Sequence, residues 1–285
     1  METLKYNLRK SISLLLFVFF IASFVACDVI DDEDKLIVDD KIPSKNIKNT
    51  VLLEDFTGVL CKNCPDAASV AHDIQDKLGS QLIIVSIHAG PYSSSAPEYQ
   101  SEAGNSYLNK FYPAANEFPA GIISRKQVDG SLVHTNFKKW ETYIMERLNS
   151  DIMGNRLFDF DMFPQFSEET NEIRIESTIK AYNNLSGVHL QLWITESGVV
   201  GNQLTNTEFK NDYIHNHMLR DAINGIWGEE IESMEEDSEK LLSNTYSLND
   251  KEWDTNNLHI VGFIYDSKTM EVLQVLEKSL IEVEE

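Results

Sequence analysis

The chain has 285 residues and carries 46 Asp and Glu against 24 Lys and Arg, which gives a net charge of −22 at pH 7. A surface this acidic repels nucleic acid and anionic lipid, so we exclude DNA and RNA as partners. The length suits two domains of ordinary size.

The first predicted element is a signal peptide, residues 1–26. Basic residues precede an apolar run over 12–26 that has the length of a signal core and is short for a membrane span. Ala26 followed by Cys27 resembles the lipobox of bacterial lipoproteins. The resemblance implies cleavage before Cys27 and attachment of lipid, such as palmitate, to this cysteine. The alternative is an ordinary signal peptide in which Cys27 has no role.

An acidic tether is predicted over residues 27–49. Residues 28–49 contain seven acids and four lysines without a clear apolar period, which is typical of a solvated linker. The acidic cluster after Cys27 also resembles the signal that sends Bacteroidetes lipoproteins to the cell surface. A linker without a targeting role is the alternative.

Residues 50–152 alternate strand-like and helix-like runs and predict an α/β domain. The apolar runs 51–56 and 82–87 predict strands, and apolar residues at helical spacing predict a helix over 65–78 between them. The rest of the predicted order is a loop with a short helix over 89–117, a strand from 118 to 123 and a helix over 137–148. This order of β-α-β followed by β-β-α is that of the thioredoxin fold.

The pattern changes over residues 155–285, where apolar residues recur at every second position. Such short alternating runs, separated by polar turns, predict an all-β, immunoglobulin-like sandwich. The runs lie at 158–162, 173–181, 188–194, 258–265 and 272–281.

Cys61 and Cys64 stand three residues apart between the predicted strand and helix. A helix N-terminus favours the thiolate of the first cysteine, and the second is close enough to resolve a mixed disulfide. A zinc site would need about four ligands, which this region lacks, so we expect no metal and no cofactor. A purely structural disulfide is one alternative, but the loop it would close is very short, so it would constrain the unfolded chain little. A redox-capable disulfide fits the spacing and an extracytoplasmic compartment best.

The region around the cysteines resembles the thioredoxin-like superfamily. Asp55, or Glu54 if the strand register differs by one, stands where that family places the acid that moves a proton to or from the second cysteine. Pro119 resembles the cis-proline that faces the disulfide and guides a substrate strand. Leu60, where thioredoxins have Trp, and Lys62-Asn63, where they have Gly-Pro, depart from the family pattern.

A wider resemblance is to the Bacteroidetes outer-membrane protein twenty-eight family, carried by residues 54–58, 61–65, 118–125 and 213–220. It implies a lipoprotein of the outer membrane, facing the periplasm or the cell surface, with a thioredoxin-like domain followed by an immunoglobulin-like domain. Family members are described as possible adhesins or receptors.

Two functions follow from these patterns. In the first, Cys61 attacks a partner disulfide, Cys64 resolves the mixed disulfide, Asp55 manages its proton and Pro119 presents the partner backbone. The partner would be an envelope or surface protein, and the lipid on Cys27 would hold the protein at the membrane. In the second, the protein is a surface binding module with a structural disulfide.

The two functions predict different surroundings for the cysteines. A cis peptide at Pro119 beside an exposed Cys61 favours exchange, whereas a pair buried beneath residues 89–117 favours a structural disulfide. His215 and His217 lie two apart, so on a strand they would face the same way. They could then contribute to a metal site or simply form hydrogen bonds at an interface.

Overall fold

The computed structural model describes residues 49–150 and 157–281. The predicted signal peptide, the tether and Cys27 lie outside these residues, as does the predicted boundary between 152 and 155. The α-helices of the described chain are α2 (Cys64–Leu78), α3 (Glu102–Phe111) and α4 (Trp140–Asn149).

The first half contains the strands that local patterns predict. The four strands are β1 (Val51–Thr57), β2 (Leu82–His88), β3 (Ala120–Ile123) and β4 (Val133–His134). β1 pairs in parallel with β2 and antiparallel with β3. α2 follows β1 and buries Ala67, Ala71 and Ile74, one apolar stripe at helical spacing. The predicted helix and its two flanking strands are therefore confirmed.

The second half is all β. Its strands are β5 (Phe158–Ser167), β6 (Glu172–Ala181), β7 (Val188–Glu196), β8 (Val199–Leu204), β9 (Phe209–His215), β10 (Met218–Ala222), β11 (Glu229–Ile231), β12 (Glu239–Ser247), β13 (Leu258–Asp266) and β14 (Val272–Ser279). In β5 and β6 buried and solvent-facing residues alternate, as a sheet with one face on the core requires.

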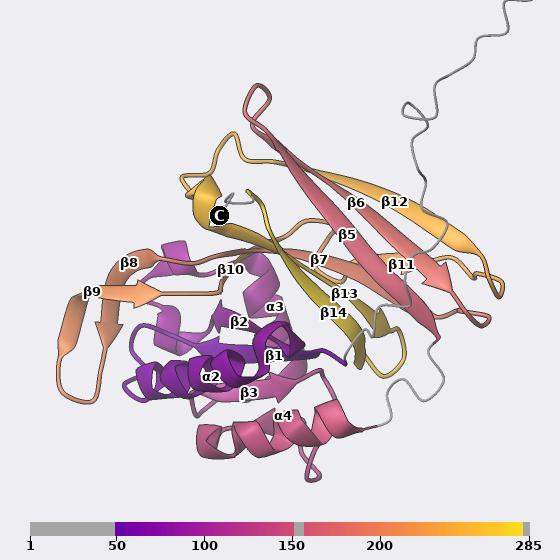
Figure 1. Ribbon diagram of the computed structural model, residues 1–285. Coiled ribbons are helices and arrows are strands. Elements are labelled where there is room, and N and C mark those ends of the chain that lie inside the picture. Colours follow the sequence, from indigo (N-terminus) through magenta and orange to yellow (C-terminus); the bar gives the residue numbers. More distant parts are fainter. Residues whose placement is uncertain (1–48, 151–156, 282–285) are drawn as a thin grey trace, which may run out of the picture. The chain divides into compact units, whose positions relative to one another are not determined.

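The predicted fold class, a thioredoxin-like α/β domain followed by a separate immunoglobulin-like sandwich, is wrong. β10 pairs antiparallel with β7 and in parallel with β2, where the amide of Ser86 donates to the carbonyl of His217 at 2.8 Å. The strands of both halves therefore form one mixed nine-stranded sheet in the order β14-β13-β7-β10-β2-β1-β3-β4, with β11 added beside β7 (Figure 1). The described chain contains no separate thioredoxin-like domain.

Packing explains why the two halves share a sheet. One cluster of buried side chains joins Leu52 and Ile87 of the first half to Trp193, Phe263 and Val275 of the second. Neither half could bury these groups alone, because each contributes only one wall of the cluster. Alternating periodicity identifies strands in the sequence but does not reveal which strands pair over such distances.

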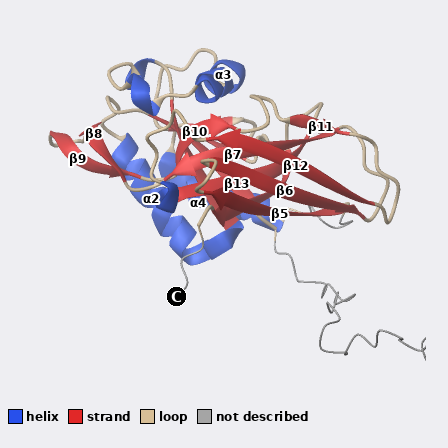
Figure 2. Ribbon diagram, turned by 90° about the horizontal axis from the view of Figure 1, so that it is seen from above, coloured by secondary structure: helices blue, strands red, loops and turns tan. Residues whose placement is uncertain are grey.

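A second layer covers the large sheet in the C-terminal half. β12, β6 and β5 form a three-stranded sheet (Figure 2). Its inner residues, such as Phe160 and Ile175, share a buried cluster with Leu192 of β7 and Ile260 of β13. The predicted alternation was thus correct for individual strands, but one of the two facing sheets extends into the first half.

Candidate functional site

Cys61 and Cys64 form a disulfide at the junction between β1 and α2. Cys64 is the first residue of α2, and its amide donates to the carbonyl of Cys61 at 3.3 Å. Pro65 follows in the first turn, where its missing amide hydrogen removes no helical hydrogen bond. Both cysteines are buried, with exposed fractions of 3% for Cys61 and 2% for Cys64.

One of the segments that lie against the cysteine loop comes from residues 89–117, the predicted loop with a short helix. The amide of Leu60 donates to the carbonyl of Tyr92 at 2.9 Å. An ideal Cβ on Gly58 would lie 2.5 Å from the Tyr92 backbone, so only glycine allows this close approach. Cys61 is therefore not the exposed thiol that an immediately accessible exchange site requires.

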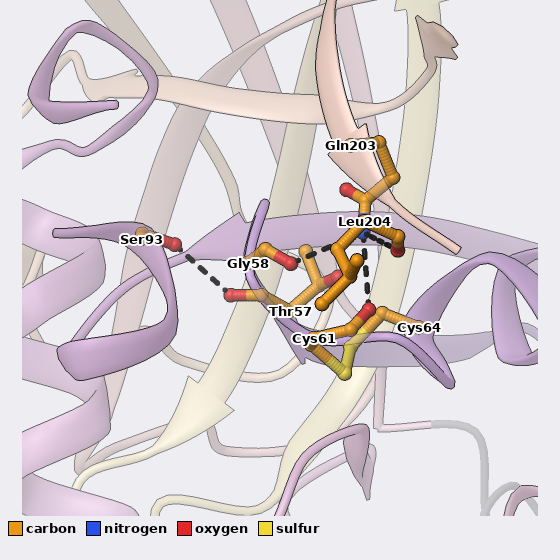
Figure 3. Close-up of a disulfide and its surroundings, with 7 residues drawn as sticks. All are labelled: Thr57, Gly58, Cys61, Cys64, Ser93, Gln203 and Leu204. Atoms are coloured by element: carbon orange, nitrogen blue, oxygen red, sulfur yellow. Dashed lines mark hydrogen bonds between the residues drawn. A yellow bond between two sulfur atoms is a disulfide. The ribbon is translucent and has the colours of Figure 1, made fainter. Parts of the chain in front are cut away.

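The other segment that lies against the cysteine loop is the hairpin of β8 and β9, which forms a two-stranded sheet of its own. The side-chain amide of Gln203 donates to the carbonyl of Cys61 at 3.0 Å and to that of Gly58 at 3.3 Å (Figure 3). The amide of Leu204 donates to the carbonyl of Val59 at 2.7 Å. The second half of the chain thus lies directly on the cysteine loop.

Pro119 immediately precedes β3, and the peptide bond between Phe118 and Pro119 is cis. It is buried, and its neighbour Phe118 belongs to the same apolar cluster as Cys61 and Cys64. Of the two observations that would favour exchange, the structure contains the cis peptide but not an exposed Cys61.

The two adjacent acids of β1 have different surroundings. The carboxylate of Glu54 accepts hydrogen bonds from Nε and Nη2 of Arg125, and the shortest, from Nη2 to Oε1, is 2.9 Å long. Both side chains are buried. Aromatic rings surround this guanidinium, including those of Phe111 and Phe263. Both carboxylate oxygens of Glu54 are therefore occupied by Arg125.

Asp55 faces the other side of the sheet and has no such partner. It is 1% exposed, and its Oδ1 has no hydrogen-bond partner among the described residues. Burial without a compensating charge raises the pKa of Asp55 to about 7. The sequence left open whether Asp55 or Glu54 is the acid without a charged partner. In the observed register it is Asp55.

Asp55 lines a cavity of about 420 Å³ to which both halves of the chain contribute. β1 and β2 contribute Asp55 and His88, α2 contributes Cys64 and His72, and the hairpin contributes further polar side chains. The hairpin residues are Gln203, Tyr213 and His215. A polar cavity beside a disulfide, with a buried unpaired acid, has the composition of a site for proton transfer.

Two histidines of this cavity, His88 and His215, are neutral at physiological pH. Burial lowers the pKa of His88 to about 3 and that of His215 to about 4. The two rings lie 5.0 Å apart, and Nδ1 of His88 has no hydrogen-bond partner in the described chain. A neutral imidazole can accept a hydrogen bond, but it adds no charge that would stabilise the Asp55 carboxylate.

The structure does not support the metal alternative for His215 and His217. His217 follows β9 and has a left-handed backbone (φ 55°), and its ring lies 5.2 Å from that of His72 rather than beside His88. No group of three or more His, Cys, Asp or Glu in residues 49–150 and 157–281 could hold a metal ion.

Sequence reasoning missed Gln203, His88, Tyr213 and the Glu54–Arg125 pair. The only local signal for the hairpin was a short polar segment, residues 205–208, between two runs that contain Val and Ile. Nothing in the sequence placed this hairpin on the cysteines.

Comparison with known proteins identifies the family. Residues 106–283, well over half of the chain, match the family described as outer membrane protein Omp28. The chain belongs to the Omp28 family. This confirms the predicted family and the predicted location at the outer membrane. The matched residues begin after Cys64, so membership does not test the function of the cysteine pair.

Solved structures resemble this Omp28-family chain at low sequence identity. HBP35 of Porphyromonas gingivalis matches with a TM-score of 0.64 and 14% identity over 82% of this chain and 76% of its own. Protein AGR_C_4864 from Agrobacterium tumefaciens matches with a TM-score of 0.50 and 13% identity over 83% of this chain and 97% of its own. These likenesses show a shared fold alone.

A domain of the outer membrane lipoprotein Omp28 from Porphyromonas gingivalis is 26% identical over 44% of this chain and 88% of its own, with a TM-score of 0.32. No curated protein matches significantly. Among the residues described, no helix is long and apolar enough to cross a membrane. Lipid attachment at Cys27 stays a prediction.

Proposed function

We propose that this Omp28-family protein carries out thiol–disulfide exchange in the cell envelope through Cys61 and Cys64. The observation that carries the proposal is Asp55, a buried acid with an unpartnered oxygen in the cavity that Cys64 also lines. A buried unpaired carboxyl is costly for stability, and such groups are concentrated at functional sites. The structural interpretation of the disulfide gives no reason for this acid.

The pKa of Asp55, raised to about 7 by burial, suits the proton transfers of such a reaction. In the reduced protein the Cys61 thiolate attacks a partner disulfide, and one partner sulfur leaves as a thiolate. Cys64 then gives its proton to the Asp55 carboxylate and attacks the Cys61 sulfur. The Cys61–Cys64 disulfide re-forms, the partner's second sulfur leaves as a thiolate, and the partner has gained two electrons.

The partner in this proposal is an envelope or surface protein, and lipid on Cys27 holds the protein at the membrane. The net charge of −22 makes an anionic partner surface unfavourable. Pro119 immediately precedes β3 and is next to Phe118 of the cysteine cluster. In this proposal it binds the backbone of the partner.

A second candidate is a binding module of the adhesin or receptor type with a structural disulfide. The observation that favours it is the burial of both cysteines. In this case the binding residues would lie on exposed loops, and the hairpin carries three exposed apolar side chains. These are Val200, Phe209 and Ile214.

A trapping experiment distinguishes the two candidates. In Cys64→Ala the mixed disulfide at Cys61 cannot be resolved, so we expect adducts with envelope proteins that disappear on reduction. The Cys61→Ala/Cys64→Ala variant is the control and should form none. Absence of adducts, together with a wild-type disulfide that resists mild reductants, would contradict exchange and favour the binding module.

A further inference from the structure

The tip of the β8–β9 hairpin is attached to the cysteine loop by few contacts. Gln203 donates to the carbonyls of Gly58 and Cys61 and also lies 2.9 Å from the carbonyl of Leu204. The Leu204 amide donates to Val59, and Asn206 donates to the carboxylate of Asp66 on α2 at 2.8 Å. Gln203 is the one residue of segment 203–212 that is buried, at 2% exposed.

The base of the hairpin is held differently from its tip. Val199 packs against a small buried cluster that contains Val59, Tyr99 and Met218. His215 is buried against His88 at the other strand end. An irregularity between Gly201 and Gln203 interrupts the pairing of β8 with β9 and separates this fixed base from the tip.

The tip is also the more weakly held of the two segments that lie against the cysteine loop. Residues 206–212 are exposed, and the hairpin does not join the large sheet. The other segment, around Tyr92, is fixed by Ser93, which is fully buried and donates to the carbonyl of Thr57 at 3.2 Å. Segments with few buried contacts open locally at lower cost than the rest of a fold.

We propose that Gln203 is a positioning residue of the Cys61/Cys64 site. Its side chain holds the hairpin tip (residues 203–212) closed against the cysteine loop, and reagents reach the disulfide only when this tip moves away. The inference deepens the proposed exchange reaction and rests on it for its biological role. Gln203 acts through the carbonyls of Gly58 and Cys61 and takes no part in the bond changes.

The test compares Gln203→Met with Lys210→Met. Methionine keeps the length of the side chain but donates no hydrogen bond to the cysteine loop. Lys210 is the exposed cross-strand partner of Gln203, so its substitution is the matched control. The first measurement is the rate at which dithiothreitol reduces the native disulfide to two thiols, itself becoming a cyclic disulfide.

The second measurement is hydrogen exchange of the Leu204 amide, which is protected by its bond to Val59. Loss of two hydrogen bonds should raise the population of the open tip roughly tenfold or more. We expect Gln203→Met to increase both the reduction rate and the Leu204 exchange rate by the same factor, with the global unfolding midpoint little changed. Lys210→Met should leave both rates at the wild-type value.

Two results would overturn the proposal. One is an unchanged reduction rate in Gln203→Met while Leu204 exchanges faster, which would mean that reagents take another route. The other is a wild-type reduction rate that rises with urea as steeply as global unfolding, which would mean that no local opening exposes the disulfide. If Gln203→Met does not fold, Asn206→Ala weakens the same tip at an exposed position and should raise both rates in parallel.

The reduction assay uses dithiothreitol and needs no envelope partner, so its result is independent of the trapping experiment. Faster reduction in Gln203→Met without trapped adducts would support the opening of the hairpin tip but not exchange with an envelope protein. Trapped adducts with an unchanged reduction rate would support exchange but not the opening of the tip.

Discussion

At the scale of single residues, two neighbouring acids on one strand have opposite roles. Successive residues of a strand point to opposite faces, so Glu54 meets Arg125 on one side and Asp55 meets the cavity on the other. The ion pair compensates the burial of Glu54, whereas nothing charged compensates the burial of Asp55. Asp55 should therefore lower the stability of the fold when it ionises.

This predicts a pH-dependent effect of Asp55→Asn. The folded pKa of about 7 exceeds the ordinary value of 3.8, so stability is full below pH 4 and is lost as the pH rises through 7. Asparagine does not ionise. The unfolding free energy of the variant relative to wild type should therefore increase by roughly 4 kcal/mol between pH 4 and pH 8.

Urea unfolding of the oxidised proteins at several pH values measures this difference. Other buried groups also titrate, including Glu277, whose pKa burial raises to about 7, but they contribute equally to both proteins. Asp76→Asn on the exposed face of α2 is the matched control. A difference that does not vary with pH would show that Asp55 is not the buried, unpaired acid described above.

At the scale of elements, the hairpin is positioned by a close contact at its base. Gly201 of β8 lies against Tyr99, so that an ideal Cβ on this glycine would overlap the tyrosine hydroxyl. Tyr99 itself is mostly buried in the cluster that holds Val199. The hairpin can therefore lie over the cavity only because residue 201 has no side chain.

Gly201→Ala should displace Tyr99 or the hairpin and destabilise the fold by about 1–3 kcal/mol, the usual cost of overpacking. Tyr99→Phe removes the overlapping hydroxyl. The double variant should therefore be less destabilised than the sum of the two single variants. Unfolding free energies of all four proteins form the cycle that measures this coupling, and strict additivity would contradict the contact.

At the scale of the whole molecule, the two halves share a sheet and a core. β10 lies between β2 and β7, and the apolar cluster at Leu52 is completed by Trp193 and Phe263. A polypeptide that lacked the second half would expose the edge of β2 and one side of this cluster. The two halves are therefore parts of one folded unit and are not separate domains joined by a linker.

We accordingly expect residues 49–150 expressed alone to lack a cooperative unfolding transition. Residues 49–281 should unfold in one transition, with amides of β1 and β13 losing protection together. Urea unfolding of the two polypeptides, monitored by circular dichroism and by hydrogen exchange, measures this difference. A cooperative transition in the shorter fragment would show that the first half folds by itself.

The sequence by itself determined the features that depend on local physics. The period of apolar residues placed β1, α2 and β2, and the spacing of Cys61 and Cys64 placed a disulfide at the strand–helix junction. The acidic charge predicts, on electrostatic grounds, that nucleic acid is not a partner, and this stays a prediction. These patterns act between residues a few positions apart, where the backbone geometry of helices and strands sets which side chains meet.

Only the tertiary structure decided what surrounds the disulfide. Gln203 and Cys61 are 142 positions apart, and Arg125 and Glu54 are 71 apart. Contacts at such separations depend on the shapes of packed surfaces and leave no periodic signal in the chain. The same reason explains the wrong fold class, because the insertion of β10 beside β2 is a choice of pairing partner that neither strand's own sequence encodes.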